Sequence, residues 1–190
     1  MSNTFFTSDL HFFHKNIIDY CDRPFNSIEE MNQGIIDNWN SVVQPEDIVY
    51  ILGDISFGKS DETIKLLEQL NGELHLILGN HDLPNKYIIP YLEFFESIDT
   101  LKEIKITEPQ SQEILHITLC HYPMVAWNRS HHGSLHLYGH VHGQYDNPES
   151  LSMDVGIDTH PEFRPYSLNE VLVKLYKKSI SKTITKKDKI

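Results

Sequence analysis

The chain has 190 residues, of which 39% are hydrophobic, and its formal net charge is −11 at pH 7. This length and composition suit one folded domain with a sizeable core and exclude a largely disordered chain. The negative charge disfavours long nucleic acids as partners, and no run of about 20 apolar residues could span a membrane. No signal peptide is recognisable, and Cys21 and Cys120 are expected to be reduced thiols, so we expect a cytoplasmic protein.

Strands and helices alternate in the first half of the chain. Three apolar stretches that run into polar loops are predicted strands, at residues 4–8, 48–52 and 74–78. Ser27 and Glu30 have the spacing of a capping box, and the apolar residues that follow at intervals of three and four form one face of an amphipathic helix. Ser60 is the expected cap of a second helix. The pattern therefore predicts the order β-α-β-α-β.

The second half of the chain is richer in strands. Residues 101–107 and 113–119 flank a turn-like segment and predict a hairpin, and two more strands are predicted at residues 135–138 and 151–155, so we expect mostly antiparallel pairing here. Ser167 and Glu170 form another capping-box pattern, which opens a short helix. Two packed sheets flanked by helices accommodate both halves in an α/β fold.

The predicted domain covers residues 1–178, and a lysine-rich tail of residues 179–190 follows it. Lysines gather near this end of the chain, at Lys174, Lys177, Lys178, Lys182, Lys186, Lys187 and Lys189. We expect a flexible, solvated tail, and the alternative is an arm that seeks phosphates or a membrane surface.

Five patches of metal-binding side chains lie where predicted strands end. They contain Asp9 and His11; Asp54; Asn80, His81 and Asp82; His121; and His140 and His142. Taken singly, each residue has an ordinary explanation as a cap, a turn residue or a core histidine. Carboxylates and imidazoles together suit Mn²⁺, Fe²⁺ or Zn²⁺ better than Ca²⁺ or Mg²⁺. The patches offer enough ligands for two ions, which can activate a water and hold a phosphate together.

In chain order the patches read D-x-H, G-D, G-N-H-D, H and G-H-x-H, and with these motifs the chain resembles the calcineurin-like metallophosphoesterases. The match spans Asp9 to His142, and the surrounding segments look like the small single-domain bacterial and phage members. The resemblance implies a four-layer α/β/β/α sandwich of two mixed sheets flanked by helices, with the site at the strand ends.

The resemblance also implies roles for individual residues. One metal ion would be held by Asp9, His11, Asp54 and His142, and the other by Asp54, Asn80, His121 and His140, with Asp54 bridging them. His81 would protonate the leaving oxygen or stabilise the transition state, Asp82 would orient His81, and a hydroxide bridging the ions would be the nucleophile. Mn²⁺ is the favoured metal, and Fe, Zn and Ni are the alternatives.

Further residues are candidates for binding the substrate. Polar loops that suit a phosphate pocket contain Arg23, Asn128, His131 and His132, although Arg23 could instead pair with a surface carboxylate such as Asp22. We predict a phosphoesterase that hydrolyses a small phosphodiester or nucleotide. The alternatives are a phosphomonoesterase and, in a different class, a catalytically silent scaffold that binds proteins on the same fold.

Overall fold

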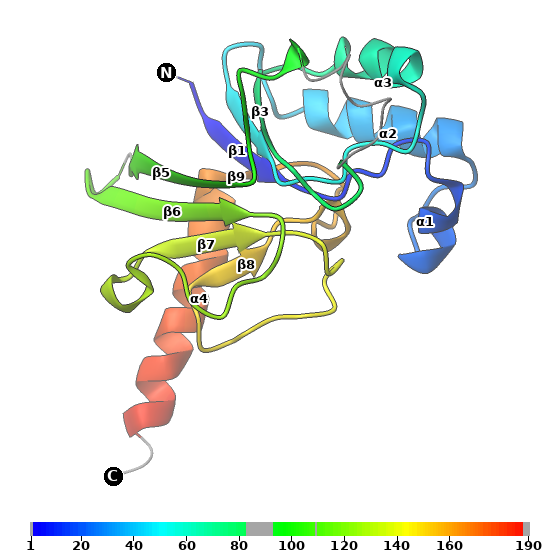
Figure 1. Cartoon of the computed structure of the whole chain (residues 1–190). Helices are drawn as coiled ribbons and strands as arrows, with labels where there is room; N and C mark the ends of the chain where they lie inside the picture. Colours follow the sequence, from blue (N-terminus) through cyan, green and yellow to red (C-terminus); the bar gives the residue numbers. More distant parts are fainter. Residues whose placement is uncertain (1, 83–92, 109, 188–190) are drawn as a thin grey trace.

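The computed structural model describes residues 2–82, 93–108 and 110–187, whose strands form two sheets (Figure 1). One sheet has the order β4-β3-β2-β1-β9, with β1 (Thr4–Thr7), β2 (Ile48–Ile51), β3 (Glu73–Ile77), β4 (Ser97–Asp99) and β9 (Tyr166–Ser167). The other has the order β5-β6-β7-β8, with β5 (Leu101–Thr107), β6 (Ile114–Cys120), β7 (Leu135–Tyr138) and β8 (Ser152–Asp154). The helices are α1 (Lys15–Tyr20), α2 (Ile28–Asn40), α3 (Ser60–Leu67) and α4 (Leu168–Lys187).

The first sheet confirms the predicted alternation of strands and helices. Strands β1 to β4 run parallel, and β9 pairs antiparallel with β1. Helix α2 connects β1 to β2, and α3 connects β2 to β3, as the sequence pattern predicts. Strands β4 and β9 are too short for hydrophobic periodicity to reveal them. Because parallel strands end at the same edge, the loops after β1, β2 and β3 lie together.

The second sheet corrects the expected strand directions. Strands β5 and β6 form the predicted antiparallel hairpin, but β6 pairs parallel with β7, and β7 pairs parallel with β8. The expectation of mostly antiparallel pairing is therefore wrong. The segments 121–134 and 139–151 return along the sheet before the next strand begins, and such crossovers join parallel strands. As a consequence, β6 and β7 also end at one edge, next to the ends of the first sheet (Figure 1).

The helix starts follow the capping signals in part. The Ser27 hydroxyl accepts the N–H of Glu30 at 3.1 Å, but the Glu30 carboxylate accepts the N–H of Asn26 rather than that of Ser27. Helix α3 begins at Ser60 with Lys59 as its N-cap, so the predicted cap is displaced by one residue. The capping box that opens α4 is confirmed. This helix continues to Lys187 and is much longer than predicted, while the flexibility of the tail stays a prediction.

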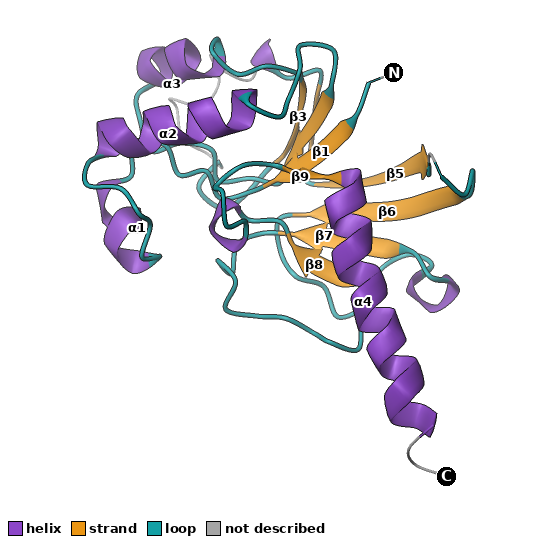
Figure 2. Cartoon of the chain, turned by 180° about the vertical axis from the view of Figure 1, so that it is seen from behind, coloured by secondary structure: helices purple, strands orange, loops and turns teal. Residues whose placement is uncertain are grey.

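Strand β1 contributes side chains to two separate cores, one on each face of the first sheet. On β1, Phe5 faces a cluster beneath α2 and α3 that includes Met31 and Trp39, whereas Phe6 faces a cluster between the sheets that includes Leu137. Helix α4 packs against β9, β1 and β8 (Figure 2). It adds apolar side chains to the cluster between the sheets. The α/β/β/α arrangement of two mixed sheets flanked by helices is thus confirmed.

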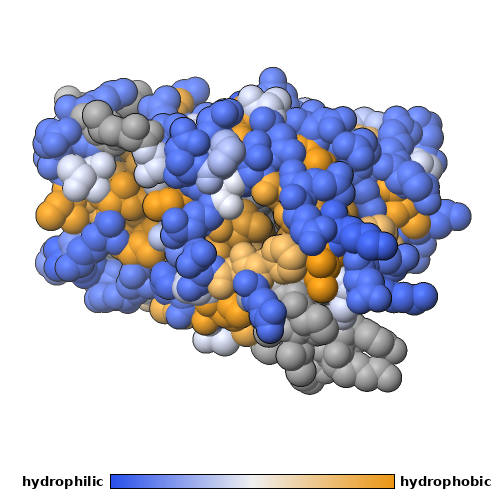
Figure 3. Space-filling model, turned by 90° about the horizontal axis from the view of Figure 1, so that it is seen from above, coloured by the Kyte–Doolittle hydropathy of each residue, from blue (hydrophilic) through white to orange (hydrophobic). Residues whose placement is uncertain are grey.

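The surface is mostly hydrophilic on the face seen from above, with hydrophobic residues gathered over the left and centre of the view (Figure 3). A cavity of about 510 Å³ lies between the start of β1, the far end of the β5–β6 hairpin and the first turns of α4. It is at the opposite end of these strands from the five patches. Within the described residues, no helix combines the length and hydropathy needed to cross a bilayer.

Candidate metal centre

Five of the seven predicted metal ligands have left-handed backbone conformations. Their φ angles are 56° at Asp9, 50° at His11, 56° at Asp54, 71° at His140 and 47° at His142. For residues other than glycine, this conformation costs about 1–2 kcal/mol each. Hydrogen bonds between the patches hold two of these residues in place, because the N–H of His11 donates to the Asp54 carbonyl at 3.0 Å and that of His140 donates to Oδ2 of Asp9 at 2.9 Å. Strain gathered in this way is typical of functional sites.

The motif glycines allow the patches to approach one another closely. A side chain at Gly139 would overlap the Ser8 hydroxyl and the carboxylate of Asp9, and one at Gly79 would overlap the carboxylate of Asp54. The glycines are therefore required by close backbone approach at the site, in addition to any role in turning the chain.

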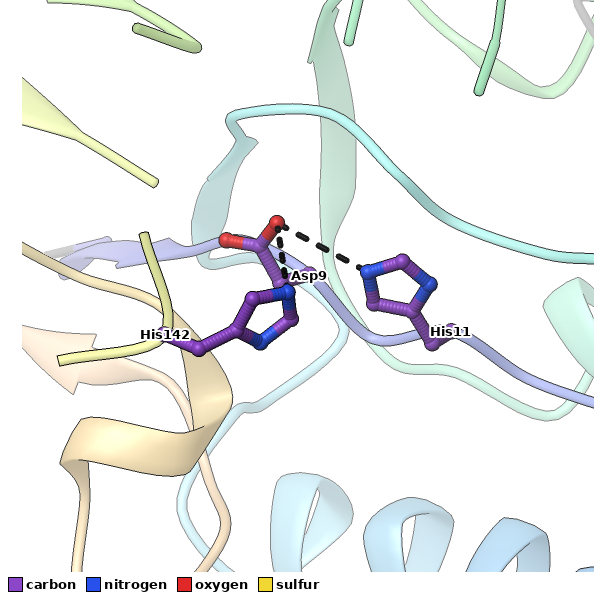
Figure 4. A group of neighbouring side chains, drawn as sticks. All are labelled: Asp9, His11 and His142. Carbon is purple, nitrogen blue, oxygen red and sulfur yellow. Dashed lines mark ion pairs between the residues drawn. The ribbon is translucent and has the colours of Figure 1, made fainter. Parts of the chain in front are cut away.

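The first predicted ligand set comes together at the ends of β1, β2 and β7. Oδ1 of Asp9 lies 3.8 Å from Nε2 of His11 and 3.9 Å from Nε2 of His142 (Figure 4). Nε2 of His11 also lies 3.7 Å from Oδ2 of Asp54. Ligand atoms around one ion, at about 2.0–2.2 Å from it, lie roughly 3–4 Å apart. Within the part of the chain that the structure describes, Oδ1 of Asp9 and Nε2 of His11 are buried without a hydrogen-bond partner, so the residues fit a bound cation.

The second predicted set shares Asp54 with the first. Nε2 of His121 lies 3.6 Å from Oδ2 of Asp54 and 3.0 Å from Oδ1 of Asn80. Oδ2 of Asp54 thus faces imidazoles of both sets, a position from which it could bridge two ions. The exposed His140 ring lies 5.1 Å from the His121 ring, centroid to centroid, and it is not among the described atoms grouped closely enough to share an ion. The structure therefore brings together three of these four ligands and places His140 beside them.

Hydrogen bonds fix which nitrogen of two histidines faces the centre. Nδ1 of His121 lies 2.6 Å from the Leu52 carbonyl, and Nδ1 of His142 lies 2.7 Å from Oδ2 of Asp158. Each acceptor requires a proton on Nδ1, which leaves Nε2 free for a metal. Burial opposes charging of His142, but hydrogen bonds with Asp158 and Cys21, together with the negative charges of Asp9 and Asp158, outweigh burial and raise its pKa to about 10. The negative charges around His142 that favour its protonated, positively charged form also favour a bound metal cation.

His81 lies beside the ligands with much of its side chain open to solvent. Its side chain is 47% exposed, and its Nε2 lies 4.0 Å from Oδ2 of Asp54. The imidazole packs against the ring of Phe57 at 4.7 Å between centroids. A side chain that borders the ligands and also reaches solvent is placed to meet a substrate.

Asp82 has a different role from the one expected. Its buried carboxylate accepts the backbone N–H groups of Asp54 at 2.7 Å, Gly79 at 2.8 Å and Ile55 at 3.2 Å. Burial raises its pKa despite these donors. The carboxylate thus ties the loop after β2 to the loop after β3, and the prediction that it orients the imidazole of His81 is corrected.

Comparison with known proteins gives one consistent family. The profile of the calcineurin-like phosphoesterase domain matches residues 3–144. The chain belongs to the calcineurin-like phosphoesterase family. An uncharacterized protein of Methanocaldococcus jannaschii is 34% identical over 97% of both chains, and the gene 66 protein of Mycobacterium phage L5 is 32% identical over 75% of this chain and 78% of its own. A protein of unknown function from Aquifex aeolicus shares the fold, with a TM-score of 0.65 and 23% identity over 90% of this chain and 98% of its own.

In this phosphoesterase, Arg23 is a buried structural residue and not a substrate-binding one. Arg23 is 3% exposed, and its guanidinium donates to both carboxylate oxygens of Asp158, at 2.7 and 2.9 Å. It also donates to the carbonyls of Asp9 and Leu10 and approaches the sulfur of Met31. All five N–H groups are therefore engaged. Both the substrate-binding prediction and the alternative pairing with Asp22 are wrong, because the partner is an interior carboxylate distant in sequence.

The other three predicted substrate-binding residues lie away from the ligand cluster. Nδ2 of Asn128 donates to the Glu103 carboxylate on β5 at 3.0 Å. His131 and His132 are exposed in the short helix η2 (Ser130–His132), which precedes β7, whereas His140 follows β7. The structure therefore places these two histidines at the opposite end of β7 from the candidate metal centre (Figure 1).

Two aromatic residues that the sequence patterns did not reveal border the site. Phe57 is 42% exposed and packs on the rings of His11 and His14 at 5.2 and 4.2 Å between centroids. Tyr122 is 45% exposed and lies 4.8 Å from the ring of His140. Aromatic side chains are not typical metal ligands, so a search for ligand motifs does not identify them. Only their positions near motif residues could have indicated that they border the site.

Proposed function

We propose that this family member hydrolyses small phosphodiesters or nucleotides with two divalent metal ions, preferentially Mn²⁺. The observation that carries the proposal is the position of the Asp54 carboxylate, whose Oδ2 lies within 4.0 Å of imidazole nitrogens of His11, His121 and His81. Divalent ions bound here would lower the pKa of a coordinated water and neutralise phosphate charge.

The protein groups around the proposed ions have separate tasks. Asp9 and Asp54 supply negative charge from a buried position, while Asn80 can ligate through its amide oxygen without adding charge. His81 is the group placed to hold a proton for the departing ester oxygen, because it borders the ligands and is open to solvent. These tasks follow from the donor chemistry and describe a phosphoester hydrolysis.

The state of Arg23 supports a diester over a monoester. A monoester dianion is commonly held by guanidinium groups that grip two phosphate oxygens. Arg23 is brought close to the ligand loops, but its donors are all engaged by protein atoms, as described above. A phosphodiester carries only one negative charge and needs less of this support. Phosphomonoester hydrolysis is the alternative that the same assay tests.

The proposal includes a small substrate, rather than a long nucleic acid, and a cytoplasmic location. The net charge of −11 gives no general attraction to a nucleic-acid backbone. Cys21 and Cys120 are both free thiols, as predicted, which supports a reducing compartment.

A substrate panel with controlled metal content tests the proposal. Purified protein is stripped with chelator, analysed for metal, and assayed on an aryl phosphodiester, an aryl phosphomonoester and a cyclic nucleotide, with and without added Mn²⁺ or Mg²⁺. We expect activity only with added metal, higher with Mn²⁺, and faster on the diester. Full activity in metal-free protein would refute metal dependence, and faster monoester hydrolysis would refute the diester preference.

A further inference from the structure

A buried carboxylate links two loops of the candidate metal centre. Asp158 lies in the short helix η3 (Ile157–Thr159), and its side chain is only 5% exposed. Its Oδ2 accepts from Nδ1 of His142 at 2.7 Å and from the guanidinium of Arg23 at 2.9 Å, while Oδ1 accepts from Nε of Arg23 at 2.7 Å. One side chain thus contacts a predicted metal ligand and a buried cation.

The guanidinium extends this link to the loop after β1. Arg23 donates to the carbonyl of Asp9 at 2.8 Å and to that of Leu10 at 2.9 Å. Asp9 and His142, which face each other across 3.9 Å, are therefore tied together behind their metal-facing atoms. The tie consists of charge-assisted bonds in a buried setting, which define geometry strictly.

Two of the histidines at the centre, His121 and His142, are held by different acceptors. His121 is held by the neutral backbone carbonyl of Leu52, and His142 is held by the charged carboxylate of Asp158. We propose that Asp158 is a positioning residue for the ion at Asp9, His11 and His142, with Arg23 as its anchor, and that the ion at His121 does not depend on it. This inference rests on the proposed two-ion function and adds an asymmetry between the two ion sites.

The expected effect follows from the chemistry of the acceptor. A carboxylate behind a histidine fixes its tautomer and ring orientation and raises its basicity as a ligand, and its loss typically weakens metal binding about 10–100-fold. Asp158→Asn keeps the shape of the side chain but removes the charge. We therefore expect one of two dissociation constants to rise about 10–100-fold and the other to stay within about twofold.

Calorimetric titration of metal-free protein with Mn²⁺ tests the inference, with the absorption spectrum of bound Co²⁺ as a second readout. The variants are Asp158→Asn, Arg23→Lys, and Asp37→Asn as the matched control, since Asp37 is an exposed carboxylate on α2. Circular dichroism and thermal unfolding of each metal-free variant show whether it folds. Arg23→Lys keeps the charge but not the five donors of the guanidinium, so it should weaken binding of the same ion, by less than Asp158→Asn does. If Asp158→Asn does not fold, Arg23→Lys is the variant that tests the inference.

Different outcomes separate this inference from the function on which it rests. If the unsubstituted protein binds two ions and folded Asp158→Asn binds both with unchanged affinity, Asp158 has no positioning role. An equal loss at both ions in a folded variant would also overturn the inference, because the asymmetry would be absent. If the unsubstituted protein binds no ion, the proposed function fails, and the inference fails with it.

Discussion

Replacement of His81 by alanine tests whether this residue protonates the leaving group in the proposed reaction. The backbone N–H of His81 donates to Oδ1 of Asp54 at 2.9 Å, and this bond survives in His81→Ala. The imidazole itself approaches Asp54 only at 4.0 Å and otherwise packs on the rings of Phe57 and His11. Because the ligand positions do not depend on the imidazole, we expect His81→Ala to keep its metal ions and lose turnover.

The size of the loss should depend on the leaving group. Removal of a general acid typically lowers the rate by about 10²–10⁴, which corresponds to about 2.7–5.4 kcal/mol in activation free energy. A nitrophenolate leaves with little protonation, so its hydrolysis should suffer least. An alkoxide such as a ribose oxygen must be protonated as it leaves, so its hydrolysis should suffer most. The ratio of wild-type to variant rates should therefore rise with the pKa of the leaving group.

The assay is steady-state hydrolysis of a series of diesters at saturating Mn²⁺, with metal analysis of each protein sample. His132→Ala is the matched control, since His132 is exposed in η2 at the far end of β7. It should change neither metal content nor rate. A rate ratio that does not vary with leaving-group pKa would remove His81 from the acid role and leave it, at most, as a stabiliser of transition-state charge.

Three further predictions address the ligands and the scaffold. Asp54→Asn should bind fewer than two ions per chain, because this carboxylate faces both ligand sets; metal analysis that still finds two ions would contradict bridging. In Asp82→Asn the remaining carbonyl can accept two of three backbone donors, so denaturant unfolding should show a loss of about 1–3 kcal/mol for the unsatisfied one. Partial burial raises the pKa of Glu170, but hydrogen bonds from Arg164 and Ser167 lower it to about 2 from 4.5. Its contribution to stability is therefore present above pH 4.5 and lost as pH falls toward 2, and Glu170→Gln should flatten that part of the unfolding profile.

The clustering of the candidate ligands could be predicted because it depends mainly on where the strands end. Asp9, Asp54 and Asn80 each follow a strand of one parallel set, and strands in such a set end at a shared edge. His121 and His140 follow two further parallel strands, although the sequence suggested antiparallel ones. The predicted positions of these two histidines did not depend on the strand directions. Each histidine directly follows the end of its own strand, whichever way the neighbouring strand runs.

The residues behind the ligands could not be predicted in the same way. Arg23 and Asp158 are 135 positions apart, and nothing local marks them as partners. An arginine in a polar loop suggests phosphate binding, but only the fold shows that its guanidinium points inward. Likewise, the acidic residue of the G-N-H-D motif suggests a partner for the adjacent His81, whereas Asp82 in fact binds backbone amides. Side-chain direction in loops is set by tertiary contacts, which spacing alone does not encode.

Buried carboxylates and left-handed backbone conformations at the candidate metal centre lower the stability of the fold. This cost helps to distinguish between the possible functions of the chain. Asp9 and Asp54 are buried, and both have left-handed backbone conformations. Buried charge without a full set of partners is costly, and so is this conformation at residues other than glycine. Among residues 2–82, 93–108 and 110–187, Oδ1 of Asp9 has no hydrogen-bond partner. A bound cation would offset each of these costs at the same point, whereas a scaffold that binds proteins through this fold would gain nothing from them. The local strain and the unpaired charge therefore favour a metal-dependent hydrolase over a silent scaffold.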